Sequence, residues 1–239
     1  MNKLGLLGKN ISYSFSKGYF ENKFKELHIS NYSYDIFDLQ DINKVNSIFE
    51  KPNLRGFNIT IPYKESIIPF LDELSDEAKN IGAVNCVLIK NKKRIGYNTD
   101  AYGFQKSLET KLNKTHKKAL ILGDGGASKA VQYTLNQLHI PFKIISRKGE
   151  NTFENLTKSE VEKHTLIIQT TPVGTFPTID NVLEFPFDGL SENHLVMDLI
   201  YNPEKTKFLE LAEKHNADIL NGLQMLHNQA DKAWTIWNF

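Results

Sequence analysis

The chain has 239 residues, of which 40% are hydrophobic and 24% are charged, as in an ordinary globular protein. A formal net charge of +1 gives no broad basic field, which disfavours nucleic acid and anionic membranes as partners. A single cysteine cannot form an internal disulfide, no apolar run reaches membrane-spanning length, and the seven histidines lack metal-ligand spacing. We therefore expect a cytoplasmic protein that has no metal site and binds small molecules.

Strands and helices alternate in the first half of the chain, a pattern typical of α/β proteins with a largely parallel sheet. Short apolar runs and period-two alternation predict the strands, and apolar residues at helical spacing predict the helices. In the first helix, Phe20, Phe24 and Leu27 are expected to face the core. We expect strands at residues 4–8, 32–39, 56–61, 84–89 and 94–97, the last two as a hairpin, and helices at 15–27, 41–49 and one that closes at 78–81.

Hydroxyl side chains gather between the first predicted strand and its helix. Ser12, Ser14 and Ser16 alternate along this segment. A single serine there is usually an N-cap, which accepts a hydrogen bond from an amide of the first helical turn. Three hydroxyls together could also hold a carboxylate, so both roles stay open for Ser14 and Ser16.

The third predicted strand and the hairpin also end in polar residues. Asn58 and Thr60 share one face by alternation, and Lys64 follows just past Pro62. A lysine in a turn is usually solvated, and Asp100, after the hairpin, could be merely a helix cap. A lysine and an aspartate brought to one cleft from two strand ends would instead form a pair that handles protons.

A glycine-rich turn opens the second half of the chain. Residues 119–122 form a short apolar run, and helical spacing resumes from Ser128. Glycines allow a tight turn and the close approach of a pyrophosphate, and the following helix points its amide N–H groups at the anion. This pattern predicts a phosphate-binding turn, although a tight strand-to-helix connection without a ligand would look the same. The turn consists of Gly123, Asp124, Gly125, Gly126 and Ala127.

The next strand indicates which nucleotide is bound. It spans residues 141–145 and ends at Ser146, Arg147 and Lys148. An acidic residue here would bind a ribose diol, whereas a hydroxyl and two cations suit a 2′-phosphate. We therefore expect NADP rather than NAD. The alternative for Arg147 and Lys148 is a solvated basic turn.

The rest of the second half completes another sheet. Helical spacing continues to the end of the chain, and Gln229 shares a face with the apolar positions of the last helix, where a glutamine usually makes a cap or a water contact. We expect strands at residues 166–168, 195–200 and 217–220, and helices at residues 205–215 and from residue 223 onward.

The connection that follows the strand at 141–145 is short. Only about 20 mostly polar residues lead to the next strand, whereas a full strand–helix unit takes about 30 or more. We therefore expect the nucleotide domain to lack one such unit and to carry the strand at 141–145 at or near a sheet edge. Residues 154–163 should form at most short helical turns, and the adenosine pocket should be open and bind its cofactor weakly.

A series of motifs resembles the shikimate dehydrogenase family nearly from end to end. The ordered set is specific, although no single motif would be. The motifs are Ser14-Phe15-Ser16, Gly56-Phe57-Asn58-Ile59-Thr60-Ile61-Pro62-Tyr63-Lys64, Ile81-Gly82-Ala83-Val84-Asn85, Gly96-Tyr97-Asn98-Thr99-Asp100-Ala101-Tyr102-Gly103, Gly123-Asp124-Gly125-Gly126-Ala127, Asp198-Leu199-Ile200-Tyr201-Asn202-Pro203 and Gly222-Leu223-Gln224-Met225-Leu226.

The resemblance implies an α/β protein with two domains that reversibly reduces 3-dehydroshikimate to shikimate with NADPH, in the biosynthesis of chorismate and the aromatic amino acids. A substrate-binding and catalytic domain with a mostly parallel sheet is expected at residues 1–103. A shortened Rossmann-like NADP-binding domain is expected at 104–222. The helix at 223–239 should pack back on the first domain.

The resemblance also assigns roles to individual residues. It implies that Lys64 and Asp100 are the catalytic pair. The implied substrate-binding residues are Ser14, Ser16, Asn58, Thr60, Asn85, Tyr201 and Gln229, with Asp100 also meeting a ring hydroxyl. The implied cofactor-binding residues are Gly123, Asp124, Gly125, Gly126, Ala127, Ser146, Arg147, Lys148, Thr170, Thr171 and Gly222.

Several positions depart from the family pattern. Tyr13 and Lys17 flank the two serines where the family usually has histidine and proline, and Cys86 replaces a threonine. Gln169 and Thr175 stand where the family tends to have asparagine and a methionine near the nicotinamide. These departures leave the details of cofactor contact open.

Other functions stay open beside the main one. A close relative that also uses quinate or NAD is the nearest alternative, and a nucleotide-binding sensor without catalysis is a different one. Asp124 is expected to point to solvent, and the protein is expected to be a monomer or homodimer.

Overall fold

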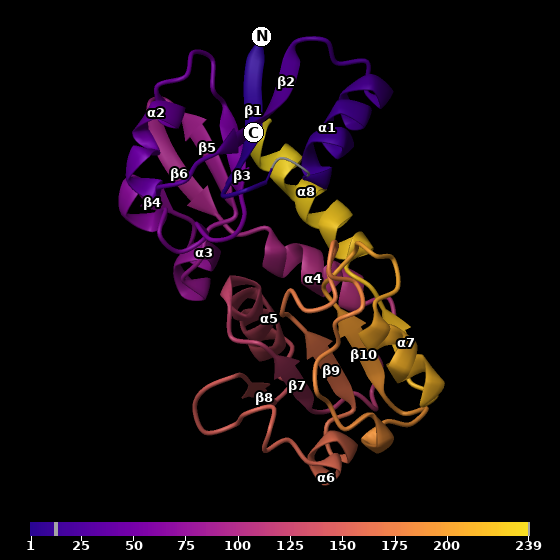
Figure 1. Ribbon diagram of the computed structural model, residues 1–239. Helices are drawn as coiled ribbons and strands as arrows, with labels where there is room; N and C mark the ends of the chain where they lie inside the picture. The colour runs from indigo at the N-terminus through magenta and orange to yellow at the C-terminus, as the bar shows by residue number, and fades with distance from the viewer. Residues whose placement is uncertain (12–13, 239) are drawn as a thin grey trace. The chain divides into compact units, whose positions relative to one another are not determined.

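The computed structural model describes residues 1–11 and 14–238, which form two compact units (Figure 1). The first unit comprises Met1–Thr99 with Ala230–Phe239, and the second comprises Asp100–Gln229. Each unit contains one sheet. The chain therefore leaves the first unit once and returns to it within its last helix.

The first unit contains a six-stranded sheet with the strand order β2-β1-β3-β5-β6-β4. β1 pairs parallel with both β2 and β3, β5 and β6 form the expected antiparallel hairpin, and β4 pairs parallel with β6. The sheet is therefore mostly parallel, as predicted. Its strands are β1 (Asn2–Gly8), β2 (Tyr32–Asp38), β3 (Gly56–Ile59), β4 (Glu73–Leu74), β5 (Cys86–Lys90) and β6 (Lys93–Tyr97).

Helices cover both faces of this sheet. One face packs against α1 (Phe15–Glu26) and the end of α8 (Leu223–Trp237), where the Trp237 indole N–H donates to the Val87 carbonyl oxygen over 2.9 Å. The apolar side chains of this layer come from segments far apart in the sequence, which burial holds together. The other face packs against the 3-10 turns Ile42–Lys44 and Ile68–Phe70 and the helices α2 (Asn46–Phe49) and α3 (Asp76–Ile81).

Local hydrogen bonding overturns two expectations in this unit. Leu27 does not face the core, because it is the C-cap residue of α1 and is 50% exposed. The third strand ends at Ile59 rather than at residue 61. The Thr60 N–H still donates to the Leu7 carbonyl oxygen over 2.9 Å, but Pro62 has no N–H with which to continue the ladder.

The second unit contains a five-stranded sheet with the order β11-β10-β9-β7-β8, in which all pairs are parallel. In such a sheet ligands bind outside the carboxyl ends of the strands. The strands are β7 (Ala119–Leu122), β8 (Phe142–Ile145), β9 (Leu166–Gln169), β10 (Leu195–Asp198) and β11 (Asp218–Leu220).

β8 lies at the edge of this sheet, so the expectation of a missing strand–helix unit is confirmed within the described residues. The connection from β8 to β9 contains one short helix, α6 (Lys158–Glu162). An ion pair between Lys143 of β8 and Glu160 of α6 joins the edge strand to this helix.

Helices also cover both faces of the second sheet (Figure 1). One face packs against α4 (Asp100–Leu108) and α5 (Gly126–Gln137), and the other against α6, α7 (Lys207–Lys214) and the 3-10 turn Phe187–Gly189. Because both faces are covered, the strands are continuous apolar runs rather than alternating ones.

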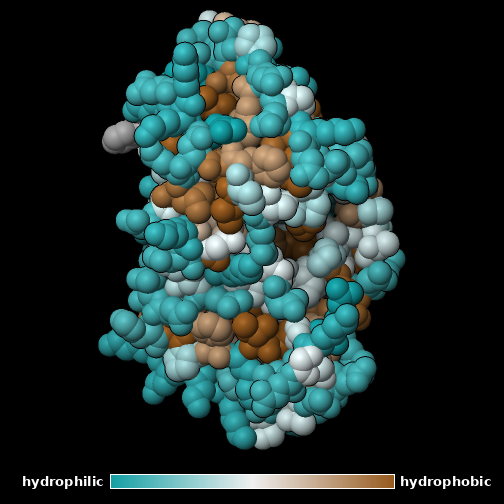
Figure 2. All heavy atoms as spheres, turned by 90° about the vertical axis from the view of Figure 1, so that its left-hand side faces the viewer, coloured by the Kyte–Doolittle hydropathy of each residue, from teal (hydrophilic) through white to brown (hydrophobic). Residues whose placement is uncertain are grey.

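Hydrophilic side chains predominate on the face shown in Figure 2, with smaller apolar patches between them. Among residues 1–11 and 14–238, no helix combines the length and hydropathy that a membrane span requires. The same residues contain no group of three or more histidine, cysteine, aspartate or glutamate side chains placed to hold a metal ion.

Candidate functional site

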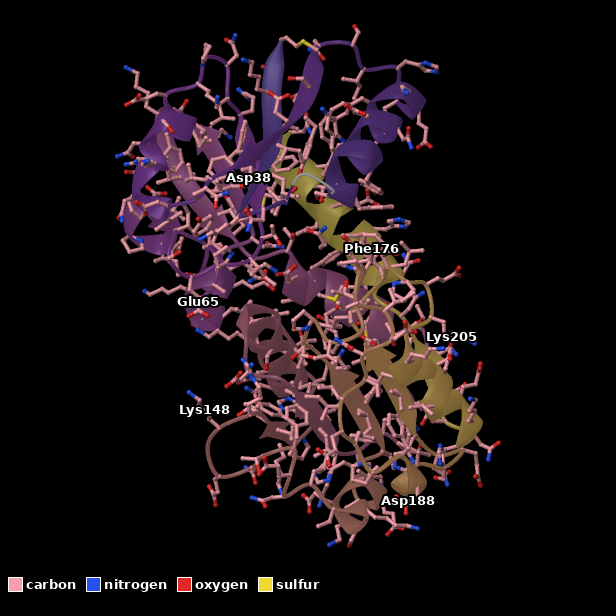
Figure 3. All side chains as sticks on the ribbon, in the orientation of Figure 1. Asp38, Glu65, Lys148, Phe176, Asp188 and Lys205 are labelled. Atoms are coloured by element: carbon pink, nitrogen blue, oxygen red, sulfur yellow. The ribbon has the colours of Figure 1, made fainter. Side chains whose placement is uncertain are left out.

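The serine turn lies between β1 and α1. Ser14 is the N-cap of α1, and its hydroxyl accepts a hydrogen bond from the Ser16 N–H over 3.3 Å. The Asp38 carboxylate, at the end of β2 (Figure 3), accepts hydrogen bonds from the backbone N–H groups of Asn10 and Ile11 at 2.9 and 3.3 Å. Asp38 therefore anchors the segment that leads into the turn, while Ser12 lies outside the described residues.

Asn58 of β3 lies in a buried polar network. Its side-chain oxygen accepts a hydrogen bond from the Tyr34 hydroxyl over 2.9 Å, and its amide nitrogen donates to the Asn85 carbonyl oxygen over 3.3 Å. Burial raises the pKa of Tyr34 well above its usual value, with a contribution from Cys86, while the Ser16 side chain acts in the opposite direction. The Tyr34 hydroxyl therefore stays protonated and remains a donor to Asn58.

The Asn85 side chain extends the network to the end of the first unit. Its amide nitrogen donates to the Thr99 hydroxyl over 3.0 Å, and its side-chain oxygen accepts the Thr99 backbone N–H over 2.6 Å. Thr99 directly precedes Asp100, which begins α4 and is 6% exposed. A buried side-chain pair thus holds the backbone immediately before the candidate catalytic aspartate.

Lys64 lies in the turn that follows β3. Its carbonyl oxygen accepts the Val84 N–H over 2.7 Å, which ties this turn to the residue before Asn85. The neighbouring Tyr63 is buried, and its hydroxyl donates to the Leu39 carbonyl oxygen over 2.6 Å. The backbone at Lys64 is therefore tied to the segment before Asn85, next to a tyrosine that is itself buried and hydrogen-bonded.

The glycine turn of the second unit follows β7. Gly123 has φ +114°, a conformation that favours glycine, and a Cβ there would lie 2.7 Å from the Thr170 hydroxyl. Thr170 in turn donates through both its N–H and its hydroxyl to the Leu122 carbonyl oxygen, each over 2.9 Å. The turn after β7 and the segment after β9 therefore lie together at the carboxyl edge of the sheet.

The residues of this turn fit a dinucleotide phosphate. α5 begins after Gly125, an N-cap residue that offers its helix no side-chain acceptor, and a Cβ at Gly125 would meet nothing within 4 Å. The first amide N–H groups of α5 and the helix dipole therefore face space that an anion can enter. Asp124 is exposed, as expected.

The basic turn follows β8 and is bent back on itself. The Ser146 hydroxyl donates to the Lys148 carbonyl oxygen over 2.6 Å, and the Ser146 N–H donates to the Asn151 carbonyl oxygen over 3.0 Å. Ser146 is 7% exposed, whereas Arg147 and Lys148 are exposed, and Lys148 points away from the ribbon in Figure 3. Ser146 thus orients the turn that presents both cations.

The segment after β10 carries Tyr201 and is held by a buried carboxylate. Asp198 accepts hydrogen bonds from the Thr206 hydroxyl over 2.6 Å and from the Ile200 N–H over 3.0 Å. Burial raises the pKa of Asp198 to about 6, against these two hydrogen bonds. Gly222 packs against the same segment, and its N–H donates to the Ile200 carbonyl oxygen over 2.9 Å.

Comparison with known proteins places the chain among its relatives. Residues 6–87 match the family model described as the shikimate dehydrogenase substrate binding domain. A protein of Methanococcus maripaludis named shikimate dehydrogenase (NADP(+)) is 39% identical over 98% of this chain and 91% of its own length. The chain belongs to the shikimate dehydrogenase family.

Solved structures of shikimate dehydrogenases have the same fold. The enzyme of Aquifex aeolicus matches all of this chain and 92% of its own, with a TM-score of 0.88 and 34% identity. The enzyme of Thermus thermophilus, in complex with NADP(H) and shikimate, matches 99% of this chain and 93% of its own, with a TM-score of 0.87 and 27% identity. The predicted fold, an α/β substrate domain with a shortened Rossmann-like domain, is thus confirmed.

The structure gathers the candidate residues into local groups within each unit. Gln229 lies on α8 close to Gly103 of α4, because a Cβ added to Gly103 would lie 2.9 Å from the Cβ of Gln229. Ser14, Ser16, Asn58, Thr60, Lys64 and Asn85 belong to the first unit, and Asp100, Gly123, Asp124, Gly125, Gly126, Ala127, Ser146, Arg147, Lys148, Thr170, Thr171, Tyr201, Gly222 and Gln229 belong to the second.

The positions that depart from the shikimate dehydrogenase pattern have partners of their own. The Gln169 side chain is fully buried. Its amide nitrogen donates to the Val173 carbonyl oxygen and its side-chain oxygen accepts the Thr171 N–H, so Gln169 is hydrogen-bonded within the loop that follows β9. The Thr175 hydroxyl donates to the Asn202 carbonyl oxygen over 3.3 Å. Lys17 is exposed, and its ammonium nitrogen lies 3.8 Å from Glu21, while Tyr13 lies outside the described residues. Cys86 is buried.

Sequence reasoning assigned no role to three residues that hold the candidate segments of the two units: Tyr34, Asp38 and Asp198. Tyr34 lies in a strand that contains other aromatic residues. The one signal of a role would have been its hydroxyl group at a position expected to be buried, since a buried tyrosine hydroxyl usually needs a hydrogen-bond partner. Asp38 and Asp198 each stand at the end of a strand, where an acceptor often holds the following loop.

Proposed function

We propose that the protein is an NADP-dependent shikimate dehydrogenase, an oxidoreductase that acts on a CH–OH group and interconverts 3-dehydroshikimate and shikimate in chorismate and aromatic amino acid biosynthesis. The observation that carries this proposal is the 39% identity, over 98% of the chain, to a shikimate dehydrogenase (NADP(+)). The polar groups at the strand ends support it, because the substrate is a carboxylic acid with several hydroxyls, and such a ligand needs many directional contacts.

Substrate binding is assigned to residues 1–103 and cofactor binding to residues 104–222. In this assignment Ser14, Ser16 and Tyr201 meet the substrate carboxylate. Its ring hydroxyls are met by Asn58, Thr60, Asn85, Asp100 and Gln229. The N-cap role of Ser14 is compatible with this, since its hydroxyl accepts from the Ser16 N–H and still has a proton to donate.

Lys64 and Asp100 are assigned the proton chemistry. When bound, the cofactor would supply the hydride as NADPH or accept it as NADP+. Reduction of the ketone leaves negative charge on its oxygen, and in this proposal the Lys64 ammonium stabilises that charge and delivers a proton to the same oxygen. Asp100 holds the ammonium and a neighbouring hydroxyl in line.

The cofactor is assigned to the carboxyl edge of the second sheet. Gly123, Gly125, Gly126 and the first turn of α5 would hold the pyrophosphate. The backbone of Asp124 and Ala127 belongs to the same turn, and Thr170, Thr171 and Gly222 would lie along the rest of the dinucleotide. Arg147 and Lys148, oriented by Ser146, would meet the 2′-phosphate.

Arg147→Ala should weaken NADP binding selectively. We expect a loss of about 1–3 kcal/mol for NADP, because a charge-assisted contact to the 2′-phosphate disappears, and little change for NAD, which has no such phosphate. Calorimetric titration of both nucleotides measures this, with the exposed Lys163→Ala as the control. Since β8 is an edge strand, we also expect wild-type NADP binding to be micromolar or weaker. Equal binding of NADP and NAD by the wild type would contradict the assignment.

The proposed function is tested by the appearance of NADPH absorbance when purified protein is mixed with shikimate and NADP. Parallel reactions with quinate, and with NAD, separate strict shikimate dehydrogenase activity from broader use. Binding of NADP without turnover of either acid would favour a nucleotide-binding sensor instead.

We further propose that the protein acts in the cytoplasm on this small-molecule substrate. Its single cysteine is buried and forms no disulfide within the described residues, which fits a reducing compartment. The expectation of a monomer or homodimer stays a prediction.

A further inference from the structure

Tyr34 has no assigned role, yet its hydroxyl is fixed inside the first unit. The side chain is 2% exposed, and its ring stacks on Phe20 with 4.5 Å between ring centroids and an interplanar angle of 12°. The Trp237 ring packs near the Tyr34 ring from another direction, with 6.4 Å between ring centroids. The hydroxyl donates to the side-chain oxygen of Asn58 over 2.9 Å, and the Ser16 side chain also forms a hydrogen bond with it.

The Tyr34 hydroxyl determines which way the Asn58 amide faces. With its oxygen toward Tyr34, Asn58 directs its amide nitrogen at the Asn85 carbonyl oxygen, 3.3 Å away. A flipped amide would set its oxygen against that carbonyl oxygen, and two acceptors repel each other. The donor from Tyr34 and the acceptor at Asn85 therefore select the same orientation, in a buried place where an unpaired polar atom is costly.

The network continues from Asn58 toward the end of the first unit. The Asn85 carbonyl oxygen also accepts the Ile59 N–H over 2.8 Å, so β3 and the residue before β5 are joined twice at this point. The Asn85 side chain is paired with the hydroxyl and the N–H of Thr99, the residue before Asp100. A chain of buried hydrogen bonds thus runs from β2 to the backbone that leads into α4.

We propose that Tyr34 is a positioning residue of the substrate site, whose hydroxyl fixes the Asn58 amide and, through Asn85, steadies the segment before Asp100. This inference rests on the proposed function, because it takes Asn58 and Asn85 as groups that meet the substrate hydroxyls. A preset amide presents its remaining N–H to a substrate hydroxyl without first reorganising, which favours binding of the correctly oriented ring. Tyr34 itself acts through Asn58.

Tyr34→Phe tests this role, since it removes the hydroxyl and keeps the buried ring. We expect the KM for shikimate to rise about tenfold and the KM for NADP to stay within about twofold of wild type. Tyr32→Phe is the matched control on the same strand, because it removes a hydroxyl that donates to Asn238 outside the network. The control should leave both KM values within about twofold of wild type. A lower thermal midpoint for Tyr34→Phe with an unchanged KM for shikimate would overturn the inference.

A double-mutant cycle with Asn58→Ala shows whether Tyr34 acts through Asn58. We expect the double variant to have the KM for shikimate of Asn58→Ala within about twofold, because the hydroxyl then has no amide to orient. Additive effects of the two changes on the KM for shikimate would overturn the inference. In that case the proposed function would still stand if the wild-type protein turns over shikimate. A wild-type protein that does not turn over shikimate would overturn both.

Discussion

Lys64→Ala should lower kcat for shikimate oxidation about 10³-fold, which corresponds to about 4 kcal/mol of transition-state stabilisation, while the KM for shikimate changes little. The reason is that the ammonium acts mainly on the charge that develops on oxygen during hydride transfer, and less on the bound ground state. Steady-state kinetics at saturating NADP measure both parameters.

Two further variants test the partner of Lys64 and provide a control. Asp100→Asn should lose a comparable factor in kcat, because the amide keeps the shape of the side chain but not its charge. Lys79→Ala removes an exposed lysine of α3 in the same unit and should leave kcat unchanged. A Lys64→Ala protein that loses efficiency only through KM would refute the catalytic role and leave Lys64 as a binding residue.

Gly222→Ala should lower the free energy of unfolding by about 2–4 kcal/mol. A Cβ at this position would lie 2.0 Å from the carbonyl oxygen of Leu199, which is backbone and cannot rotate away. Relief would require movement of the segment that carries Tyr201 or of the start of α8, so the variant should also bind NADP more weakly. Thermal unfolding followed by circular dichroism measures the stability.

Gly18→Ala is the matched control for Gly222→Ala. Gly18 lies in α1, and a Cβ there would meet nothing within 4 Å. The same chemical change should therefore raise stability by about 0.5–1 kcal/mol through the higher helix propensity of alanine. Equal unfolding midpoints for Gly222→Ala and the wild type would show that the close approach at Leu199 carries no cost.

The order of strands and helices was predictable because apolar runs and helical spacing report burial directly. The glycine turn and the short connection after Ile145 also predicted a nucleotide sheet with β8 at its edge. The errors fell at element ends, in the helix expected at 41–49, which is a 3-10 turn followed by the short α2, and at β4, which was not predicted. The exposure of Leu27 and the end of β3 at Ile59 depend on capping and on a single missing N–H, which periodicity does not report.

For the candidate site, the sequence predicts a set of residues, which stays a prediction, and it does not identify the residues whose hydrogen bonds support them. Lys64 and Asp100 stand out because charged side chains at strand ends are chemically informative. Tyr34 escaped notice because its strand neighbours are also aromatic, and the partner of its hydroxyl, Asn58, is distant in sequence. Asp198 resembles any acidic residue at a strand end until its bonds to Thr206 and Ile200 are known.

The most direct test of the account follows the hydride itself. Purified protein is incubated with 3-dehydroshikimate and NADPH that carries deuterium at the transferable position of the nicotinamide, and the product is analysed by mass spectrometry and NMR. We predict shikimate that carries one deuterium, bound to the carbon that bore the ketone. Recovery of unchanged 3-dehydroshikimate, or of shikimate without the label, would contradict the account.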